Sequence, residues 1–264
     1  MRSLVLITGA TSGLGMQIAR EIAKEGTPLL LTGRNKEVLD QLQKELSLDT
    51  KVSILKADLS IEEERKTILD AIGIHQPDLV INSAGFGLYG AATSFPLEEQ
   101  LNMLKTNTEA LTAITLRAAQ TLIENKKTGI IMNISSAAGY LHYPGLAVYS
   151  ASKAYVTHFS QALDFETAPH GVRVLVSCPG QIATSFRKRA SKGYDQSKKN
   201  YLTLSVEHAT CLILKQIKKK KTVEVIDYRY KILLFIARFL IPKKRLYALL
   251  QKEIEKRIKP LAAK

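Results

Sequence analysis

Short runs of strongly apolar residues alternate with longer segments in which apolar residues recur every three or four positions, and this alternation continues to about residue 225. Such a rhythm is typical of repeated strand–helix–strand units, which build a parallel sheet. Strands of a parallel sheet are covered on both faces and therefore read as continuous Val, Ile and Leu runs. Runs of this kind predict seven strands, at 3–8, 28–33, 52–56, 78–82, 129–135, 172–177 and 222–226.

The segments between these runs predict helices that cover both faces of the sheet. The longest of them lie at about 97–125 and 149–168. The pattern contains no internal repeat and no low-complexity linker. We therefore expect one α/β domain over 1–226 with a doubly wound parallel sheet, followed by a C-terminal helical extension over 227–264.

A glycine-rich turn, Thr8 to Gly15, joins the first predicted strand to the next predicted helix. Its glycines, at positions 9, 13 and 15, allow a tight turn and let backbone N–H groups approach a pyrophosphate, whose charge the helix N-terminus stabilises. The place of the turn between a strand and a helix is the context that a dinucleotide-binding site requires.

Arg34 follows the second predicted strand, where an NAD-binding protein carries Asp or Glu for the ribose hydroxyls. A guanidinium group is suited to a phosphate by its planar fork of donors. We therefore predict that NADP(H) is preferred over NAD(H). The alternative is that Arg34 is a solvated basic residue at the start of a helix.

Four polar side chains are predicted to meet at the carboxyl edge of the sheet, where ligands bind in open α/β folds. Tyr149 and Lys153 are four residues apart in a predicted helix and so lie on one face, one turn apart. Ser136 ends the preceding strand, and strand alternation favours it over Ser135 as the active hydroxyl. Asn107 lies in the long helix before that strand.

These motifs resemble those of the short-chain dehydrogenase/reductase family, over roughly residues 3–225. The resemblance implies a Rossmann-type fold and hydride transfer between a nicotinamide and a carbonyl or secondary alcohol. It implies that Tyr149 is the general acid/base, Ser136 donates to the substrate oxygen, Lys153 holds the nicotinamide ribose and Asn107 anchors a proton-relaying water. It also implies a set of cofactor contacts, at Gly9, Thr11, Ser12, Gly13, Leu14, Gly15, Arg34, Asp58, Leu59, Asn82, Ala84, Gly85, Tyr149, Lys153, Pro179, Gly180, Ile182 and Thr184.

The proposed chemistry needs an acid of suitable pKa near the carbonyl oxygen. A phenol fits if its pKa falls from about 10 toward 7, which requires roughly 4 kcal/mol. A cation about 4 Å away supplies about 4 kcal/mol at an effective dielectric near 20. We therefore expect Lys153, reinforced by the charge of the oxidised nicotinamide, to lower the pKa of Tyr149. A chain lacking part of this tetrad would favour the alternative function, a non-catalytic NADP(H)-binding regulatory or scaffold protein.

The formal net charge of +14 is unevenly distributed. Residues 1–182 hold 16 basic and 18 acidic side chains, whereas residues 183–264 hold 22 basic and 6 acidic ones. The catalytic body is therefore nearly neutral. The basic segment 183–204 corresponds to the substrate lid of the family, in which Phe186, Tyr194 and Tyr201 are the residues we expect to face inward.

The C-terminal extension combines apolar and basic residues. The run from Ile232 to Ile241 is interrupted by Arg238 and is too short to span a membrane. The final helix is amphipathic, since apolar residues recur every four positions at Leu246, Leu250, Ile254 and Ile258. An apolar stripe with a cationic border suits an anionic membrane surface, so we expect peripheral attachment and a hydrophobic or lipid-like substrate. The open alternative is that these helices pack onto the substrate pocket or a partner subunit.

Other classes are excluded or disfavoured. The sequence has no helix-turn-helix, RNA-recognition or zinc-finger signature, which excludes a nucleic-acid partner. Neither Cys178 and Cys211 nor the five histidines have metal-ligand spacing, so no metal is expected. The first apolar run is a strand rather than a signal peptide, so we expect a cytoplasmic protein. The family commonly pairs subunits through its long helices, which implies a homodimer, with a tetramer as the alternative.

Overall fold

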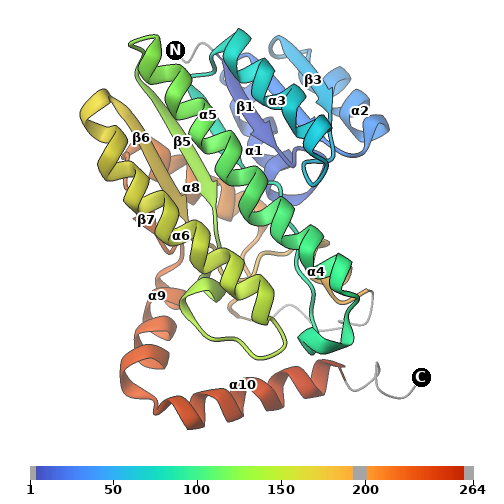
Figure 1. Ribbon diagram of the computed structural model, residues 1–264, viewed down its shortest axis with the longest axis vertical. Coiled ribbons are helices and arrows are strands. Elements are labelled where there is room, and N and C mark those ends of the chain that lie inside the picture. The colour runs from blue at the N-terminus through green and yellow to red at the C-terminus, as the bar shows by residue number, and fades with distance from the viewer. Residues whose placement is uncertain (1–3, 193–200, 259–264) are drawn as a thin grey trace.

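A computed structural model describes residues 4–192 and 201–258, with side chains described as far as residue 252. Seven parallel strands form one sheet in the order β3-β2-β1-β4-β5-β6-β7 (Figure 1). The order reverses at β1, as in a doubly wound fold, so the predicted Rossmann-type architecture is confirmed. The strands are β1 (Val5–Thr8), β2 (Leu29–Gly33), β3 (Val52–Lys56), β4 (Leu79–Asn82), β5 (Gly129–Ile134), β6 (Val172–Ser177) and β7 (Val223–Glu224).

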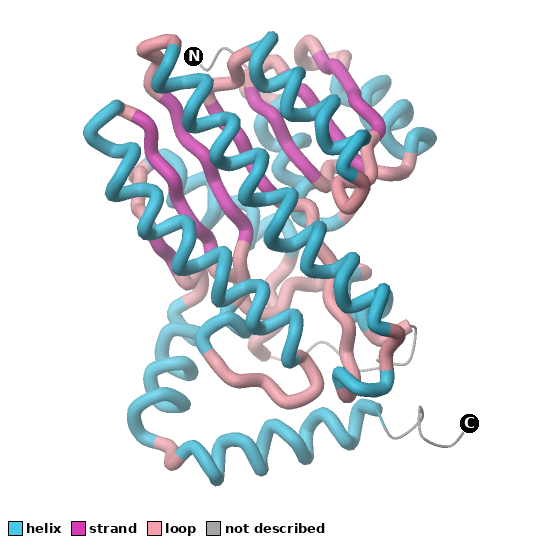
Figure 2. Tube along the Cα trace, viewed as in Figure 1, coloured by secondary structure: helices cyan, strands magenta, loops and turns pink. Residues whose placement is uncertain are grey.

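Helices cover both faces of the sheet, as Figure 2 shows. In β1, Val5 and Ile7 belong to the core under α1, α2 and α8, and Leu6 belongs to the core under α3, α5 and α6. This two-sided burial follows from the alternation of side chains along a strand. The helices are α1 (Gly13–Ala23), α2 (Lys36–Leu46), α3 (Glu62–His75), α4 (Leu97–Leu104), α5 (Leu111–Glu124), α6 (Ala147–Thr167), α7 (Phe186–Ala190), α8 (Val206–Lys218), α9 (Tyr228–Phe235) and α10 (Lys243–Ile258).

Two elements differ from the sequence prediction. The predicted strand 222–226 pairs only at Val223 and Glu224, because β7 is an edge strand and its neighbour β6 ends at Ser177. The predicted helix 97–125 is interrupted between α4 and α5 by a π-helical turn, η2 (Lys105–Ala110). Isolated π turns inside helices are frequent at functional sites.

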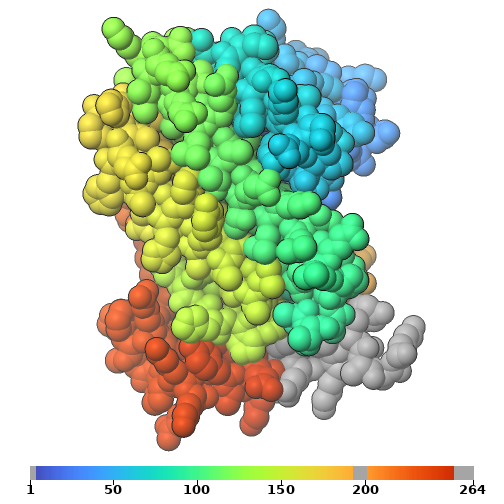
Figure 3. All heavy atoms as spheres, viewed as in Figure 1, coloured from blue at the N-terminus to red at the C-terminus, as the bar shows by residue number. Residues whose placement is uncertain are grey.

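The C-terminal extension folds back across the carboxyl end of the sheet and forms the lower end of the molecule (Figure 3). Asp227 caps α9 by accepting a hydrogen bond from the backbone N–H of Arg229, at 2.8 Å. A second π turn, η5 (Ile236–Leu240), separates α9 from α10. Of the predicted stripe on α10, Leu246 is buried and Leu250 is half-buried, and the side chains of Ile254 and Ile258 lie outside the described residues. The boundary of a separate catalytic domain at residue 226 stays a prediction.

Five of the exposed large apolar side chains of the extension form what we name the apolar ridge: Ile232, Phe235, Ile236, Phe239 and Leu240. The rings of Phe235 and Phe239 contact each other in a tilted arrangement, with centroids 5.2 Å apart, and the guanidinium of Arg238 lies 5.7 Å from the centre of the Phe239 ring. Within residues 4–192 and 201–258, no helix is both long enough and apolar enough to cross a bilayer.

Candidate active site

The glycine-rich turn before α1, which we name the cradle, packs so closely against the chain's own backbone that no side chain fits at two of its glycines. Gly9 adopts a φ of +68°, and a Cβ there would lie 2.8 Å from the backbone of Ala84. A Cβ on Gly15 would lie 2.5 Å from the carbonyl oxygen of Gly9. The hydroxyl of Thr8 accepts hydrogen bonds from the N–H groups of Ser83 and Ala84, which fixes the two loops together. The cradle therefore fits the close approach of a pyrophosphate to the backbone.

The predicted 2′-phosphate residue, Arg34, lies at the carboxyl end of β2 with its side chain 69% exposed. Its Nη1 atom is 3.6 Å from the carboxylate of Asp58, which follows β3. Burial opposes ionisation of Asp58, but hydrogen bonds from Ser60 and the charge of Arg34 lower the pKa of this carboxyl below its usual value. Thr11 packs against Gly33, where a Cβ would lie 2.5 Å from Thr11 Cγ2. The exposed guanidinium is available to a phosphate at this edge.

Two other predicted cofactor residues have their side chains in the core. The amide of Asn82 is buried and donates to Thr115 Oγ1 at 3.1 Å and to Asn133 Oδ1 at 2.9 Å. Leu59 is buried, and its carbonyl accepts a hydrogen bond from Arg65. At these positions the main chain, rather than the side chain, faces the carboxyl edge of the sheet.

Asn107 lies in the π turn η2, and its side chain is fully buried. Its Oδ1 atom accepts from the N–H of Phe86 at 3.1 Å, and its Nδ2 atom donates to the carbonyl of Phe86 at 2.9 Å and to Ser152 Oγ at 3.2 Å. A Cβ on Gly85 would lie 2.9 Å from Asn107 Oδ1. The side chain thus holds the loop after β4 against α6.

Tyr149 is buried at the first turn of α6, and the Ser136 hydroxyl lies close enough to its phenol to favour the ionised form. Ser136 follows β5, and its hydroxyl also accepts from the N–H of Ala138 at 3.2 Å. The ring of Phe186 on α7 packs against Tyr149 with ring centroids 5.7 Å apart. The structure therefore brings the predicted hydroxyl and phenol together.

Lys153 lies one turn further along α6, with its Nζ 5.9 Å from the centre of the Tyr149 ring. Nζ donates to the carbonyl of Ile134 at 2.9 Å. Burial lowers the pKa of Lys153 to about 8, so most molecules still carry the charge at neutral pH.

The pKa prediction for Tyr149 is wrong for the protein's own residues. Burial, with a smaller contribution from Tyr89, raises the pKa of the phenol above its usual value, and the hydrogen bond from Ser136 opposes this only in part. The reason is burial: the phenol lies among apolar side chains, and the ammonium of Lys153 donates to a backbone carbonyl.

Apolar side chains surround the phenol on the side away from the glycine-rich turn. Leu88, Met103, Leu146 and Tyr149 form a buried cluster, packed against Phe86, Tyr89, Phe95, Ala138, Tyr143, Val148 and Phe186. Of the residues predicted to face inward from the lid segment, Phe186 does so, Tyr201 is 76% exposed, and Tyr194 lies outside the described residues. The surroundings of the phenol are therefore suited to an apolar group.

The extension contacts the segment after β6, as the alternative of helices packed onto the substrate side allowed, although the residues that make the contact were not predicted. Tyr230 of α9 accepts a hydrogen bond from the N–H of Gln181 at 2.8 Å, and its ring occupies the space that a Cβ on Gly180 would need. On the opposite side, the carbonyl of Pro179 accepts from the N–H of Ala137 at 2.8 Å. Tyr247 of α10 hydrogen-bonds His142 in the loop before α6. No residue spacing indicates either contact.

The remaining predicted cofactor residues lie where the lid segment meets the turn. Thr184 packs against Gly13, at 3.3 Å between Thr184 Cγ2 and the Cβ position of Gly13. Ile182 forms an isolated parallel bridge with Leu204.

Cys178 is buried and Cys211 is exposed, and both are free thiols. A search of the described part of the chain finds no group of three or more His, Cys, Asp or Glu residues that could hold a metal ion.

The sequence pattern that defines the short chain dehydrogenase family matches residues 3–195. The chain belongs to this family. The predicted resemblance is thus confirmed, and the chain is an oxidoreductase of the short-chain dehydrogenase type that acts on CH–OH groups.

Relatives and a solved structure support this assignment. Sulfoacetaldehyde reductase 2 from Chromohalobacter salexigens is 37% identical over 189 residues, which is 70% of this chain and 75% of that protein. Serine 3-dehydrogenase from Rhizobium radiobacter is 36% identical over 203 residues, or 76% of this chain and 80% of that protein. A short-chain dehydrogenase from Sphingobium yanoikuyae, solved in complex with NADPH, matches this short-chain dehydrogenase with a TM-score of 0.81 at 28% identity, covering 88% of this chain and 92% of that chain.

Proposed function

We propose that this short-chain dehydrogenase interconverts a carbonyl and a secondary alcohol with NADP(H). The observation that carries the proposal is the meeting of the Ser136 hydroxyl, the Tyr149 phenol and the Lys153 ammonium at the carboxyl edge of the sheet, beside an apolar cluster. Bound nicotinamide supplies the hydride for reduction or accepts it in oxidation. The cradle of the glycine-rich turn and the exposed Arg34 are the residues that would hold the cofactor.

The chain's own groups move the proton. Tyr149 donates its phenolic proton to the substrate oxygen during reduction, while Ser136 donates a hydrogen bond to the same oxygen. The charge of Lys153, together with that of the oxidised nicotinamide, opposes the burial that raises the pKa of the phenol. The apolar cluster excludes water and accepts a hydrophobic substrate.

Replacing the phenol tests this function. We expect Tyr149→Phe to bind NADPH as the wild type does, because the ring stays, and to reduce carbonyl substrates at least about a hundredfold more slowly, because the proton donor is lost. The measurements are NADPH binding by fluorescence and turnover by NADPH oxidation over a panel of carbonyl compounds. Tyr155→Phe is the matched control, since Tyr155 lies on the same helix, is 44% exposed and bonds only Thr112 through its hydroxyl among the described residues.

Near wild-type turnover by Tyr149→Phe would contradict the assignment of Tyr149 as the proton donor. If the wild type binds NADPH but turns over no compound of the panel, the alternative function of a non-catalytic NADP(H)-binding regulatory or scaffold protein gains support.

The preference for NADP(H) over NAD(H) is part of the proposal. It is supported by the guanidinium of Arg34 at the end of β2 and by the NADPH complex of the Sphingobium relative. Asp58 is the nearest carboxylate to Arg34 within the described residues, and its ion pair at 3.6 Å is long and partly exposed, so a phosphate can replace it.

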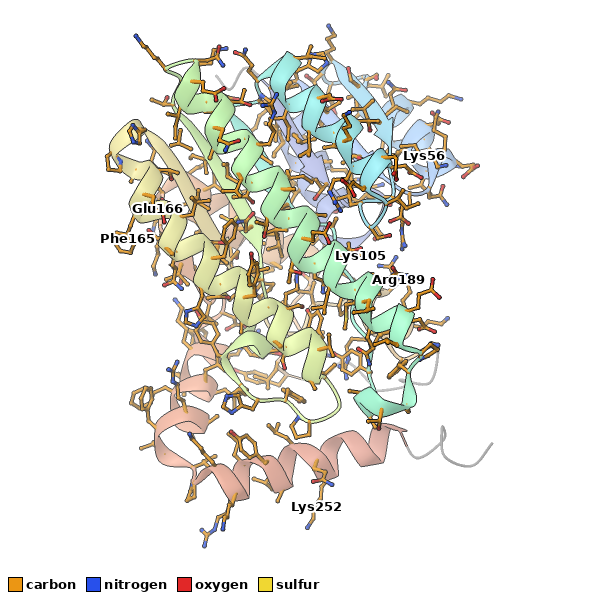
Figure 4. The ribbon with its side chains drawn as sticks, viewed as in Figure 1. Lys56, Lys105, Phe165, Glu166, Arg189 and Lys252 are labelled. Carbon is orange, nitrogen blue, oxygen red and sulfur yellow. The ribbon has the colours of Figure 1, made fainter. Side chains whose placement is uncertain are left out.

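The assembly and location of the protein are proposed on exposed apolar surface. A homodimer through α5 and α6 is supported by Leu116 and Phe165, which are 36% and 82% exposed on these helices; Figure 4 shows Phe165 at the outer edge of α6. Peripheral attachment to an anionic membrane is supported by the apolar ridge and by the exposed cations beside it, Arg238, Lys243, Lys244 and Arg245.

A further inference from the structure

Arg189 connects α7 to the glycine-rich turn. Its Nη2 atom donates a hydrogen bond to Ser12 Oγ at 3.2 Å, across 177 positions of the sequence. Ser12 is the N-cap residue of α1, but its hydroxyl does not cap the helix. The first N–H groups of α1 are therefore left for another acceptor, and a cation from a distant helix lies beside them. Figure 4 places Arg189 on the side of the molecule where β3 ends, below Lys56.

Two positive side chains lie near each other at this point, because Arg189 bonds Ser12 and the adjacent Thr11 packs on Gly33, the residue before Arg34. Burial and the positive charge of Arg34 both lower the pKa of Arg189 from its ordinary value. Arg34 has a carboxylate at 3.6 Å, that of Asp58, whereas Arg189 has no carboxylate within ion-pair distance among the described residues. Like charges held close together repel each other, and an anion between them would convert this repulsion into two charge-assisted hydrogen bonds.

We propose that Arg189 is a second cation for the adenosine 2′-phosphate of NADP(H), sharing this group with Arg34. The inference rests on the proposed function and deepens it by naming a specificity residue outside the glycine-rich turn and β2. The 2′-phosphate, rather than the pyrophosphate, is the expected partner because Arg189 bonds Ser12, and the adjacent Thr11 packs on Gly33, next to Arg34 at the ribose end of the site.

The position of Arg189 on α7 gives the contact a consequence for the catalytic group. The same helix begins with Phe186, whose ring packs on Tyr149 at 5.7 Å between centroids. Just after the helix, Lys192 bonds Glu99 of α4 at 2.9 Å. Arg189 and Phe186 are one helical turn apart in α7. Binding of the phosphate by Arg189 would therefore hold α7 in place, so that the cofactor that fits the site also fixes the Phe186 ring on Tyr149.

The test is a binding experiment that needs no turnover. NADP+ and NAD+ are titrated calorimetrically into the wild type and Arg189→Gln. We expect the variant to bind NADP+ about tenfold or more weakly, as the loss of a hydrogen bond to a charged group predicts, and to bind NAD+ within about twofold of the wild type. Lys188→Gln is the matched control, because it removes the same charge from the adjacent, exposed residue; it should change both affinities by less than about twofold.

Two results would overturn the inference while leaving the proposed cofactor in place. An equal loss for NADP+ and NAD+ would mean that Arg189 serves the pyrophosphate, and unchanged NADP+ affinity would mean that its bond to Ser12 is a surface contact. Failure of the proposed function is distinguishable, because the wild type itself would then bind NAD+ as tightly as NADP+, and the assignment to Arg189 would fall with it.

Discussion

Lys153 shows how burial and function compete at the scale of one residue. The side chain is almost fully buried, and burial lowers its pKa from 10.5 to about 8. Retaining the proton in the folded state therefore costs free energy at neutral pH. Under the proposed function this charge is needed beside Tyr149 and the bound nicotinamide, so the fold carries the cost at the proposed active site.

The cost can be measured through pH. A Lys whose pKa is lower in the folded than in the unfolded state destabilises the fold below about pH 8, and this destabilisation disappears as pH rises toward 10.5. The wild type should therefore gain about 2 to 3 kcal/mol in free energy of unfolding relative to Lys153→Met between pH 7 and 10. Urea denaturation of both proteins at the two pH values measures this gain. A difference that stays constant with pH would contradict the lowered pKa.

At the scale of elements, α9 supports the segment that is expected to hold the nicotinamide end. Tyr230 fills the space beside Gly180 and binds the N–H of Gln181. The other side of the same segment is held by the loop after β5, through the bond from Ala137 to the carbonyl of Pro179. The segment from Pro179 to Gln181 is thus packed between the loop after β5 and the extension. Under the proposed function, Tyr230 is therefore a positioning residue for this segment.

Truncation of this ring should affect both stability and turnover. We expect Tyr230→Ala to lower the free energy of unfolding by about 3 kcal/mol, through the cavity and the unpaired N–H of Gln181. The turnover number should fall severalfold while KM for the carbonyl substrate changes less, because the segment is displaced but the apolar cluster remains. Tyr228→Ala, at a residue on the same helix that is 66% exposed, is the control and should leave both properties near wild type. Equal effects of the two substitutions would refute the positioning role.

The elements also show what the sequence could and could not predict. Continuous apolar runs are a local signal, so the strands and the polar residues at their carboxyl ends were predictable, as Ser136 beside Tyr149 shows. The π turn was not, since the residue pattern over 97–125 is that of one helix, and the bonds between Asn107 and the backbone of Phe86 join it to another loop. The contacts of Arg189 with Ser12 and of Tyr230 with Gln181 depend on long-range packing that no spacing encodes.

At the scale of the whole molecule, the carboxyl edge of the sheet, which carries the candidate active site, and the apolar ridge lie at the same end. The carboxyl ends of the parallel strands point toward the extension, and α10 crosses below the loop before α6 (Figure 1). Exposed cations lie beside the ridge as well, at Arg238, Lys243, Lys244 and Arg245. A molecule attached through the ridge would therefore present its substrate side near the lipid surface.

Acidic substitutions on the ridge test this attachment. We expect the wild type to sediment with phosphatidylglycerol-containing vesicles, and Phe235→Glu/Phe239→Glu to lose at least about tenfold in vesicle affinity, because apolar insertion and attraction to anionic lipid are both weakened. Leu48→Glu/Ile74→Glu is the matched control, since it adds the same charge at residues 88% and 73% exposed outside the extension. Unchanged sedimentation of the ridge variant would rule out the ridge as the lipid-binding surface.

The parallel sheet also has a practical consequence. All strands begin at one edge, so the described chain starts at Leu4 and β1 on the opposite side of the sheet from Ser136 and the extension. Immobilisation on a sensor surface through an N-terminal tag would therefore leave the substrate side and the ridge facing the flowing solution. A C-terminal tag would place the support next to both. The direction of the strands thus decides which end of the chain should be tethered when ligands or vesicles are presented to this enzyme.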